Sequence, residues 1–427
     1  MVKIRKEKKI IKQDVYNFIY KLMVFLLVCA VFAFNDQKNL LYPIKIAYIA
    51  IMGLLFVIQN KHISFHTISR ILFIVWCLAS ILWAKNYSSV TVEFIWTLQA
   101  FVISTVTAPN VDSKKKLNFL INCIIIGATF LVIRLLVSTP LSVWGTKRVG
   151  TAVGYNSNTI GLEMIFAALS CIYFIRQSKK KFKYTGLLAV FIIIILLSGS
   201  RKSFIGIIFG VILYLILGIK KKKNIFFLLP LSLIFIYIML YSVFNIDFFY
   251  NVIGDRLEEL ILTFQGEEDN VRILMIKIGF QLFSQKPIIG YGVGAYSTEG
   301  GFGVYSHNNY IEILVNLGIV GFVIYYSIYV VMLYKLFKLW KKGNIESSLY
   351  ISFVFVLLFL EIGVVSYRNT YILLVLDACY SYINLFNTEK LKSKKPTQTS
   401  EIVLNDINKG VRQGEGDCKY GNKTNYR

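Results

Sequence analysis

The sequence has 427 residues, of which 56% are hydrophobic and only 16% are charged, whereas soluble globular proteins carry about 25% charged residues. This composition excludes an ordinary soluble domain. The formal net charge of +24 would suit nucleic-acid binding, but the basic residues lie in short runs between apolar segments, as in the cytoplasmic loops of membrane proteins.

Apolar runs long enough to cross a bilayer recur along the chain. They predict an all-α polytopic membrane protein with about twelve transmembrane helices. The first run follows a basic N-terminus, residues 1–14, and we expect a retained span rather than a cleaved signal peptide. The predicted spans lie near residues 15–34, 40–58, 67–84, 88–108, 117–137, 158–176, 184–200, 203–219, 225–246, 309–334, 349–367 and 370–386.

The distribution of lysine and arginine predicts the orientation of these spans. With both termini in the cytoplasm, the cytoplasmic side receives the basic runs at Lys114–Lys116, Lys179–Lys183, Lys220–Lys223 and Lys335–Lys342. Three connections then face outward, at 138–157, 198–203 and 247–308. The chain therefore divides into spans one to nine (15–246), a large extracytoplasmic loop (247–308), spans ten to twelve (309–386) and a basic tail (387–427) that is predicted to be disordered.

Arg201 and Lys202 lie in an outward connection, S-G-S-R-K-S at 198–203, against the trend for positive charge to stay inside. A guanidinium matches phosphate oxygens with a fork of donors, which favours an anion site at the outer membrane surface. The alternative is that both side chains only reach lipid headgroups. Arg148 is another outward arginine, and the polar run Asn156–Asn158 after it predicts a turn and a helix cap.

Arg272 is a further candidate because of the helical face on which it falls. A helix over 271–285 would have one polar stripe, formed by Lys277, Gln281, Ser284 and Gln285. Arg272 falls on the opposite side, with Met275, Ile276, Gly279 and Phe283. A guanidinium on an apolar face needs a carboxylate or a bound anion. The alternative is a frayed helix start, where the side chain bends to water.

A glycine-rich turn, Pro287–Gly294, precedes the tenth span, and its glycines predict close backbone packing or positive φ. His307 follows it at the outer mouth of that span, between Ser306 and the pair Asn308 and Asn309. Its imidazole is a candidate general base, or a group that orients an acceptor hydroxyl. The alternative is a structural role, which is more common for a lone histidine.

Seven ionisable residues within the predicted spans lie in the outward halves of those spans. Such residues are costly in lipid and usually line a cavity or pair with one another. Their shared side predicts a polar cavity that opens outward, although ion pairs are the alternative for several. They are Lys45, Glu93, Arg134, Glu163, Glu312, Glu361 and Asp377.

Several of these segments resemble motifs of the O-antigen polymerase and O-antigen ligase superfamily, the Wzy-like bacterial membrane glycosyltransferases. The resemblance covers roughly residues 100–370. It rests on R-V-G-T-A-V-G-Y-N-S-N at 148–158, S-G-S-R-K-S at 198–203, and the segment 272–321, which runs through P-I-I-G-Y-G-V-G to S-H-N-N-Y-I-E-I-L-V-N-L-G-I-V-G. It implies a fold related to GT-C glycosyltransferases. Members often have Asn-Pro-Asn where this chain has Asn156-Ser157-Asn158, which is a departure.

The resemblance implies a glycan substrate carried on undecaprenyl pyrophosphate in the outer leaflet of the plasma (inner) membrane. Arg201 and Arg272 would hold the pyrophosphate, because preorganised cations stabilise a leaving anion, and His307 would act near the acceptor. The other expected substrate-binding residues are Arg148, Lys202, Asn308, Asn309 and Glu312. The sequence has no D-x-D motif and its six cysteines show no C-x-x-C spacing, so we expect transfer without a metal or other cofactor.

The expected function is therefore a polymerase of capsule-type or O-antigen-type polysaccharide, which transfers the lipid-linked glycan onto a lipid-linked repeat unit. A ligase that uses a different acceptor is one alternative. A composition rich in Lys, Ile, Asn, Tyr and Phe suggests an AT-rich genome. Such a genome fits a capsule-making Gram-positive bacterium, which lacks lipopolysaccharide, and this favours the polymerase over the ligase. A lipid-linked oligosaccharide flippase is the alternative from another class, but transporters need charges near the bilayer midplane. A chain-length regulator and a flippase of the same pathway are the expected protein partners, and nucleic acid is not expected to bind.

Overall fold

The computed structural model describes residues 2–59, 65–151, 154–219, 225–265 and 271–394, and these residues form helices and loops with no β-strand. The all-α class is therefore confirmed. The first half of the chain contains α1 (Val2–Ala33), α2 (Lys38–Ile58), α3 (Phe65–Ala79) with a 3₁₀ turn at Ser80–Trp83, α4 (Tyr87–Asn110), α5 (Lys114–Ser138), α6 (Ser157–Gln177), α7 (Lys181–Leu197) and α8 (Arg201–Leu217).

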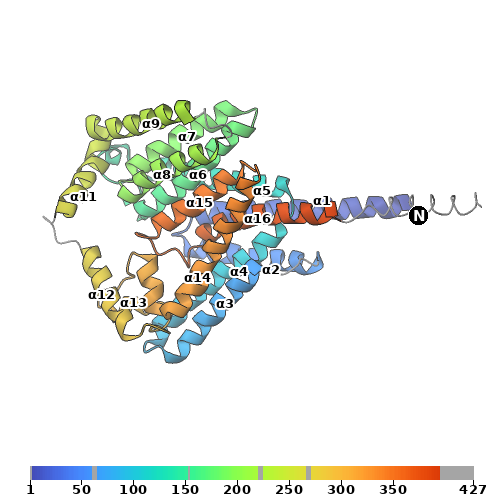
Figure 1. The fold of residues 1–427 in the computed structure, drawn as a ribbon, viewed down its shortest axis with the longest axis horizontal. Helices are drawn as coiled ribbons and strands as arrows, with labels where there is room; N and C mark the ends of the chain where they lie inside the picture. The colour runs from blue at the N-terminus through green and yellow to red at the C-terminus, as the bar shows by residue number, and fades with distance from the viewer. Residues whose placement is uncertain (1, 60–64, 152–153, 220–224, 266–270, 395–427) are drawn as a thin grey trace, which may run out of the picture. The chain divides into compact units, whose positions relative to one another are not determined.

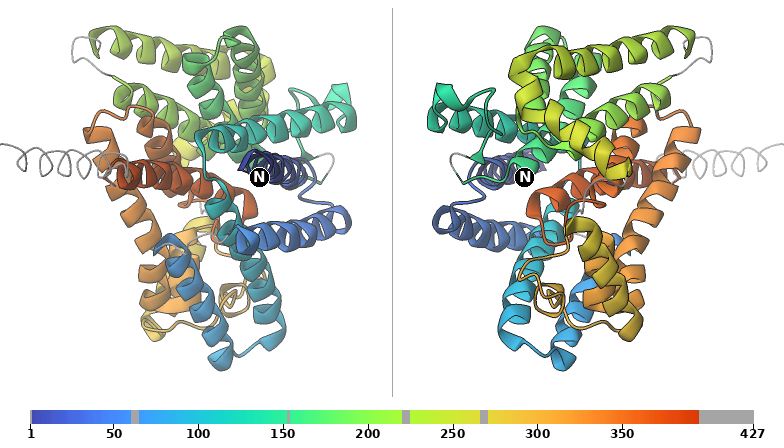
Figure 2. Two further views of the ribbon diagram at one scale, coloured as in Figure 1. Left: turned by 90° about the vertical axis from the view of Figure 1, so that its right-hand side faces the viewer. Right: turned by 90° about the vertical axis from the view of Figure 1, so that its left-hand side faces the viewer.

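The second half begins with α9 (Ile225–Asn245), which is followed by a sharp change of direction. The apolar stretch Ser232–Asn245 meets Asp247–Leu262 at an angle of 84°. Figure 2 shows the change of direction between the two helical segments. The remaining elements are α10 (Asp247–Phe249), a π-helical turn at Tyr250–Gly254, α11 (Asp255–Gln265), α12 (Val271–Gln285), α13 (Tyr296–Glu299), α14 (Asn309–Lys341), α15 (Ser347–Leu360) and α16 (Thr370–Lys394).

The helices are those of a multi-pass membrane protein. Among the described residues, six helices are long and apolar enough to cross a membrane, and the bent pair would make a seventh. Three shorter apolar helices, Thr67–Trp83, Ser347–Leu360 and Thr370–Phe386, and the 17-residue helices α7 and α8 coincide with further predicted spans. The count of about twelve spans stays a prediction.

Polar residues begin several of the helices by accepting hydrogen bonds from the first free backbone amides. Asn156 caps α6 through the amide of Asn158, so the predicted turn and cap at Asn156–Asn158 is confirmed. Ser200 caps α8 through the amide of Ser203, and Asn308 caps α14 through the amides of Tyr310 and Ile311. Helices α8 and α14 therefore start at candidate site residues, Arg201 and Asn309.

Helices α6 and α15 are deeply buried, as are residues 370–383 of α16. All residues from Ile160 to Cys171 are buried, and so are nearly all of those from Ser347 to Leu360. Helix α6 packs on α5, α7 and α8, and α15 packs on α8 and α14 (Figure 1). By contrast α2 and α9 expose large apolar side chains such as Val57, Leu233 and Tyr237. Such faces suit contact with lipid.

The predicted cytoplasmic basic residues meet at one end of the helices. Lys114 Nζ, at the start of α5, lies 2.6 Å from Glu346 Oε1, just before α15. Arg176, at the end of α6, lies over the ring of Tyr214 near the end of α8. The starts of α6 and α8, and with them the connections 138–157 and 198–203 that were predicted to face outward, lie at the other end. The structure thus separates the two predicted sides, and the candidate residues lie together at one of them.

The predicted tail differs from the structure at its beginning. Helix α16 continues to Lys394, so residues 387–394 of the segment expected to be disordered are helical. Residues 385–394 read LFNTEKLKSK, which is polar and lysine-rich without helical periodicity, so the sequence placed the boundary earlier. The rest of the tail, residues 395–427, lies outside the described residues.

Candidate active site

Arg148 joins two of the predicted outward connections. Its Nε donates to the carbonyl of Ser198 at 2.8 Å, and its Nη2 donates to Asn158 Oδ1 at 2.9 Å. The turn that receives it needs a glycine: Gly199 has φ +57°, and a Cβ there would lie 2.8 Å from Arg148 Cγ and 2.6 Å from the carbonyl oxygen of Val252. The glycine of the motif S-G-S-R-K-S therefore lets the aliphatic part of Arg148 and the start of the large loop, at Val252, pack on the same turn.

Arg201, the first residue of α8, is bound to that same loop. Its Nη1 donates to the carbonyl of Arg256 at 3.0 Å and lies 3.8 Å from Glu259 Oε2, an exposed carboxylate. Arg256, in α11, has a buried Nε with no hydrogen-bond partner in the described part of the chain. A buried donor without an acceptor is costly, so this guanidinium is poised to bind an acceptor group.

Shifts of pKa show that these cations and Arg272 act on one another. Burial and the charges of Arg256, Arg272 and Arg201 lower the pKa of Arg148 to about 10. Partial burial, followed by the charge of Arg201, lowers the pKa of Arg272 as well. Four arginines from four segments thus form one cluster. We call Arg148, Arg201, Arg256 and Arg272 the arginine cluster. Their mutual repulsion favours the binding of an anion among them.

Lys202 lies beside the cluster and points to a different connection. Its Nζ donates to the carbonyl of Gly363, between α15 and α16. A Cβ at Gly363 would lie 3.1 Å from Lys202 Cδ. The lysine thereby ties the start of α8 to residues 361–369. That same connection holds the start of α14, because Asn309 N donates to the carbonyl of Glu361 at 2.8 Å.

His307 has an unusual backbone conformation. Its φ is +57°, the one positive φ of a non-glycine residue among the described residues. The left-handed region costs a non-glycine residue about 1–2 kcal/mol, so neighbouring contacts must hold the loop. Ser306 provides them: its Oγ donates to the carbonyl of Asn308 at 2.8 Å, and its N donates to Glu312 Oε2 at 2.7 Å. The loop presents one imidazole in a fixed position.

The imidazole of His307 lies between an aromatic ring and the cations. Its ring centroid is 4.4 Å from that of Tyr305. Burial and the charges of Arg272 and Lys202 lower the pKa of His307 to about 4. At neutral pH the imidazole is therefore uncharged and able to accept a proton. The structure brings His307, Lys202 and the arginine cluster into one site.

Asn308, Asn309 and Glu312 were expected to bind substrate, but their side chains are buried and hold the protein together. Asn308 caps α14. Asn309 Nδ2 donates to the hydroxyl of Tyr326 at 3.0 Å, and its Oδ1 accepts from Ser366 N at 2.8 Å. Glu312 accepts from Ser306 N and, at 3.1 Å, from Asn316 Nδ2. These contacts favour a role in positioning His307 over direct contact with a substrate.

The turn Pro287–Gly294 fits against a break in α14. Gly318 has φ +66° and ψ −171°, which interrupts the helix. The exposed backbone groups bond to the turn: Tyr291 N donates to the carbonyl of Val315 at 2.9 Å, and Ile319 N to that of Pro287 at 2.8 Å. Gly290, Gly292 and Gly294 all have positive φ. The predicted use of these glycines for close packing and positive φ is confirmed.

Three residues near the site were not selected from the sequence, namely Arg256, Tyr305 and Arg368. Arg256 and Tyr305 belong to polar loop segments, where neither residue type is unusual. Arg368 forms an ion pair with Glu93, and its guanidinium lies 5.2 Å from the ring of Tyr305. The sequence did contain one signal for Arg368. It is a basic residue between two predicted spans on the predicted outward side, against the trend for positive charge to stay inside.

The helices and the site together define a multi-pass membrane protein with a cationic site at one end. Comparison with protein families matched residues 186–326 to the O-antigen ligase family. This segment runs from α7 into α14 and contains Arg201, Arg272 and His307, and the match confirms the resemblance to the O-antigen polymerase and ligase superfamily. Members of that family are membrane glycosyltransferases or ligases that act on lipid-linked oligosaccharides. A search of curated proteins found no match.

Proposed function

We propose that this protein is a polysaccharide polymerase of the outer face of the plasma membrane, which transfers a glycan from undecaprenyl pyrophosphate onto a lipid-linked repeat unit. The observation that carries the proposal is the arginine cluster beside a neutral histidine. Cations that lower one another's pKa favour a compact anion such as pyrophosphate, and guanidinium groups bind its oxygens through paired hydrogen bonds.

In the proposed reaction the bond between the donor sugar and pyrophosphate breaks, and the pyrophosphate leaves with the electron pair. The arginine cluster and Lys202 stabilise this negative charge where it develops. The hydroxyl of the acceptor attacks the sugar carbon and gives its proton to His307. Because the protein's own cations lie at the leaving group, we propose that no metal or other cofactor takes part.

The negative charge of the bound donor would also make His307 a stronger base. With the site empty, the nearby cations hold the pKa of His307 at about 4, which makes its imidazole a weak base. A bound pyrophosphate offsets those cations and raises this pKa toward neutrality. His307 then accepts a proton most readily when the donor is in place.

The finer features of the fold belong to the same proposal: about twelve spans, a GT-C-related arrangement, cytoplasmic termini and an extracytoplasmic loop at 247–308. A ligase is the second candidate, because the matched family model is described as O-antigen ligase. The two differ in the acceptor, which is a lipid-linked repeat unit for the polymerase. A chain-length regulator and a flippase would act before or beside it.

Deletion of the gene, followed by sizing of the glycan on carrier and at the cell surface, distinguishes the candidates. A polymerase deletion leaves single repeat units and no long chains. A ligase deletion leaves long chains on the carrier without final attachment. Repeat units held on the cytoplasmic leaflet would mean a flippase and would overturn both.

Variants then test the site. Arg201→Ala, Arg272→Ala and His307→Asn are each expected to abolish long chains while the protein stays in the membrane. Asparagine is chosen at 307 because it tolerates positive φ, so that the loop is kept and only the base is lost. Arg176→Ala, which changes an arginine at the other end of α6, is the matched control and should leave chain length unchanged. Full-length polymer from all three site variants would contradict the assignment.

A further inference from the structure

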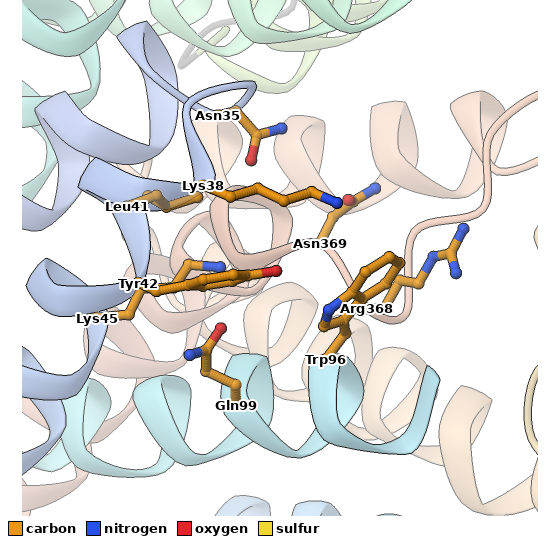
Figure 3. Close-up of a pocket in the computed structure, with 9 residues that line it drawn as sticks. All are labelled: Asn35, Lys38, Leu41, Tyr42, Lys45, Trp96, Gln99, Arg368 and Asn369. Carbon is orange, nitrogen blue, oxygen red and sulfur yellow. The ribbon is translucent and has the colours of Figure 1, made fainter. Parts of the chain in front are cut away.

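A cavity lies outside the arginine cluster, and none of the cluster's four residues lines it. It has a volume of about 240 Å³ and is bounded by the start of α2, the middle of α4 and the residues that lead into α16. Figure 3 shows Lys38, Tyr42 and Lys45 from one side, Trp96 and Gln99 from another, and Arg368 at the far edge. None of these residues belongs to the motifs that support the proposed function.

The cavity is positively charged. No carboxylate lines it, whereas Lys38 and Lys45 do. Lys38 Nζ lies 5.3 Å from the ring of Trp96, and Lys45 is partly buried in α2. Neither lysine forms an ion pair within the described ranges, whereas Arg368 is paired with Glu93. A partly buried ammonium without a counterion favours an anionic ligand.

The other lining groups suit a sugar ring. The ring of Tyr42 borders the cavity and its hydroxyl points toward Trp96, and the amide of Gln99 faces the same space (Figure 3). Aromatic faces pack against the C–H groups of a pyranose, and amides both donate to and accept from its hydroxyls. A phosphate alone would use the cations but not these groups.

The cavity shares a wall with the candidate active site. The guanidinium of Arg368 lies 5.7 Å from the ring of Trp96 and 5.2 Å from that of Tyr305. Tyr305 in turn lies against His307, with ring centroids 4.4 Å apart. Tyr305 therefore lies between His307 and the cavity. The cations that lower the pKa of His307 are not lining residues of this cavity but Arg272 and Lys202.

We propose that this cavity binds a sugar residue that carries a carboxylate, such as a hexuronic acid, in the acceptor glycan. Lys38 and Lys45 hold the carboxylate, and Tyr42, Trp96 and Gln99 contact the ring. The acceptor role rests on the proposed function, since a transferase that holds its donor at the arginine cluster must hold its acceptor across His307. The binding of an acidic sugar rests on the cavity itself.

Binding to the full-length protein in nanodiscs tests this inference, with saturation-transfer NMR as the readout and three probes: methyl glucuronide, methyl glucoside and inorganic pyrophosphate. Methyl glucuronide is expected to bind more tightly than methyl glucoside. Lys45→Gln should weaken the glucuronide by about tenfold or more, the loss expected for a charge-assisted hydrogen bond, and should leave the glucoside unchanged. Lys45→Arg keeps the charge and should keep the binding.

Two controls separate this site from the arginine cluster. Lys180→Gln, an exposed lysine at the other end of the helices, should change nothing. Arg272→Gln should weaken pyrophosphate but not methyl glucuronide. Equal affinity for both glycosides, or displacement of the glucuronide by pyrophosphate in the Arg272→Gln protein, would overturn the inference. Because these readouts need no transfer, they stand apart from the glycan-size experiment: specific glucuronide binding supports the sugar site even if deletion of the gene disproves the polymerase.

Discussion

His307 has two energetically unfavourable features, which a purely structural role would not require. Its backbone is in the left-handed region, and its side chain lies where burial and two cations disfavour protonation. Strained conformations persist only where the surroundings hold them, and they concentrate at functional sites. Here the surroundings are the buried side chains of Ser306, Asn308 and Glu312. The loop therefore fixes a neutral imidazole beside the cations.

The coupling between Arg272 and His307 can be measured directly. Arg272→Gln removes a positive charge that disfavours the imidazolium, so the pKa of His307 should rise from its value of about 4. The chain has three histidines, and replacing His62 and His66 leaves a single imidazole for NMR titration in detergent. Arg176→Gln is the control and should not move the pKa. An unchanged pKa in Arg272→Gln would separate His307 from the arginine cluster.

Residue chemistry predicted part of this site. Arg148, Arg201, Lys202 and His307 stood out in the sequence because each interrupts a largely apolar or outward segment. Their roles could not be ranked, since distances between segments far apart in the chain are not encoded in local pattern. Arg256 was missed for the same reason: only the hydrogen bond from Arg201 to its carbonyl and the effect of its charge on Arg148 distinguish it from other loop arginines.

Among the elements, the pairing of the turn Pro287–Gly294 with the break in α14 determines where His307 lies. Helix α14 starts at the His307 loop and is interrupted nine residues into the helix, at Gly318. Within a membrane the freed backbone groups need partners, and the turn supplies them. Helix α12 packs on α14 (Figure 1), so Arg272, at the start of α12, is carried by the same unit.

A glycine pair tests this fit. Gly290 and Gly303 have nearly equal φ, +69° and +67°, but a Cβ at Gly290 would lie 2.6 Å from backbone atoms of Asn316 and Leu317, whereas one at Gly303 meets nothing within 4 Å. Both alanine variants carry the cost of positive φ. Gly290→Ala should be less stable than Gly303→Ala by on the order of 1–3 kcal/mol, because it adds overlap. Thermal unfolding in detergent measures the difference, and equal midpoints would refute the close fit.

For the seven ionisable residues within the predicted spans, the structure favours the ion-pair alternative over one shared cavity. Most of the seven ionisable residues within spans have local partners. Asp377 pairs with Arg70 at 2.6 Å, Arg134 with Asp36 at 2.5 Å, and Glu93 with Arg368. Glu361 accepts from the hydroxyls of Tyr326 and Tyr329. Lys45 alone of the seven lines the cavity of Figure 3. Sequence showed that these groups need partners, but the partners come from other segments of the chain.

At the scale of the whole molecule, the two groups of basic residues lie at opposite ends of the helices. Helix α6 has 21 residues and a rise of about 1.5 Å per residue, so its two ends lie roughly 30 Å apart, about the thickness of the hydrocarbon core. The arginine cluster lies at the end where α6 and α8 begin, and Lys114 and Arg176 lie at the other. The twelve spans were predicted from hydropathy. Hydropathy alone does not determine whether short helices such as α7 and α8 cross a bilayer.

Chemical labelling decides which end faces outward. Lys147 and Lys180 are both exposed and lie in connections at opposite ends of α6. In a cysteine-free background, Lys147→Cys should react with a membrane-impermeant maleimide in intact cells, and Lys180→Cys only after permeabilisation, because lysine-rich connections stay in the cytoplasm. The two variants serve as controls for each other. The reverse pattern would place the arginine cluster and His307 at the cytoplasmic face, where a glycan already moved to the outer leaflet cannot reach them, and transfer at the outer surface would have to be abandoned.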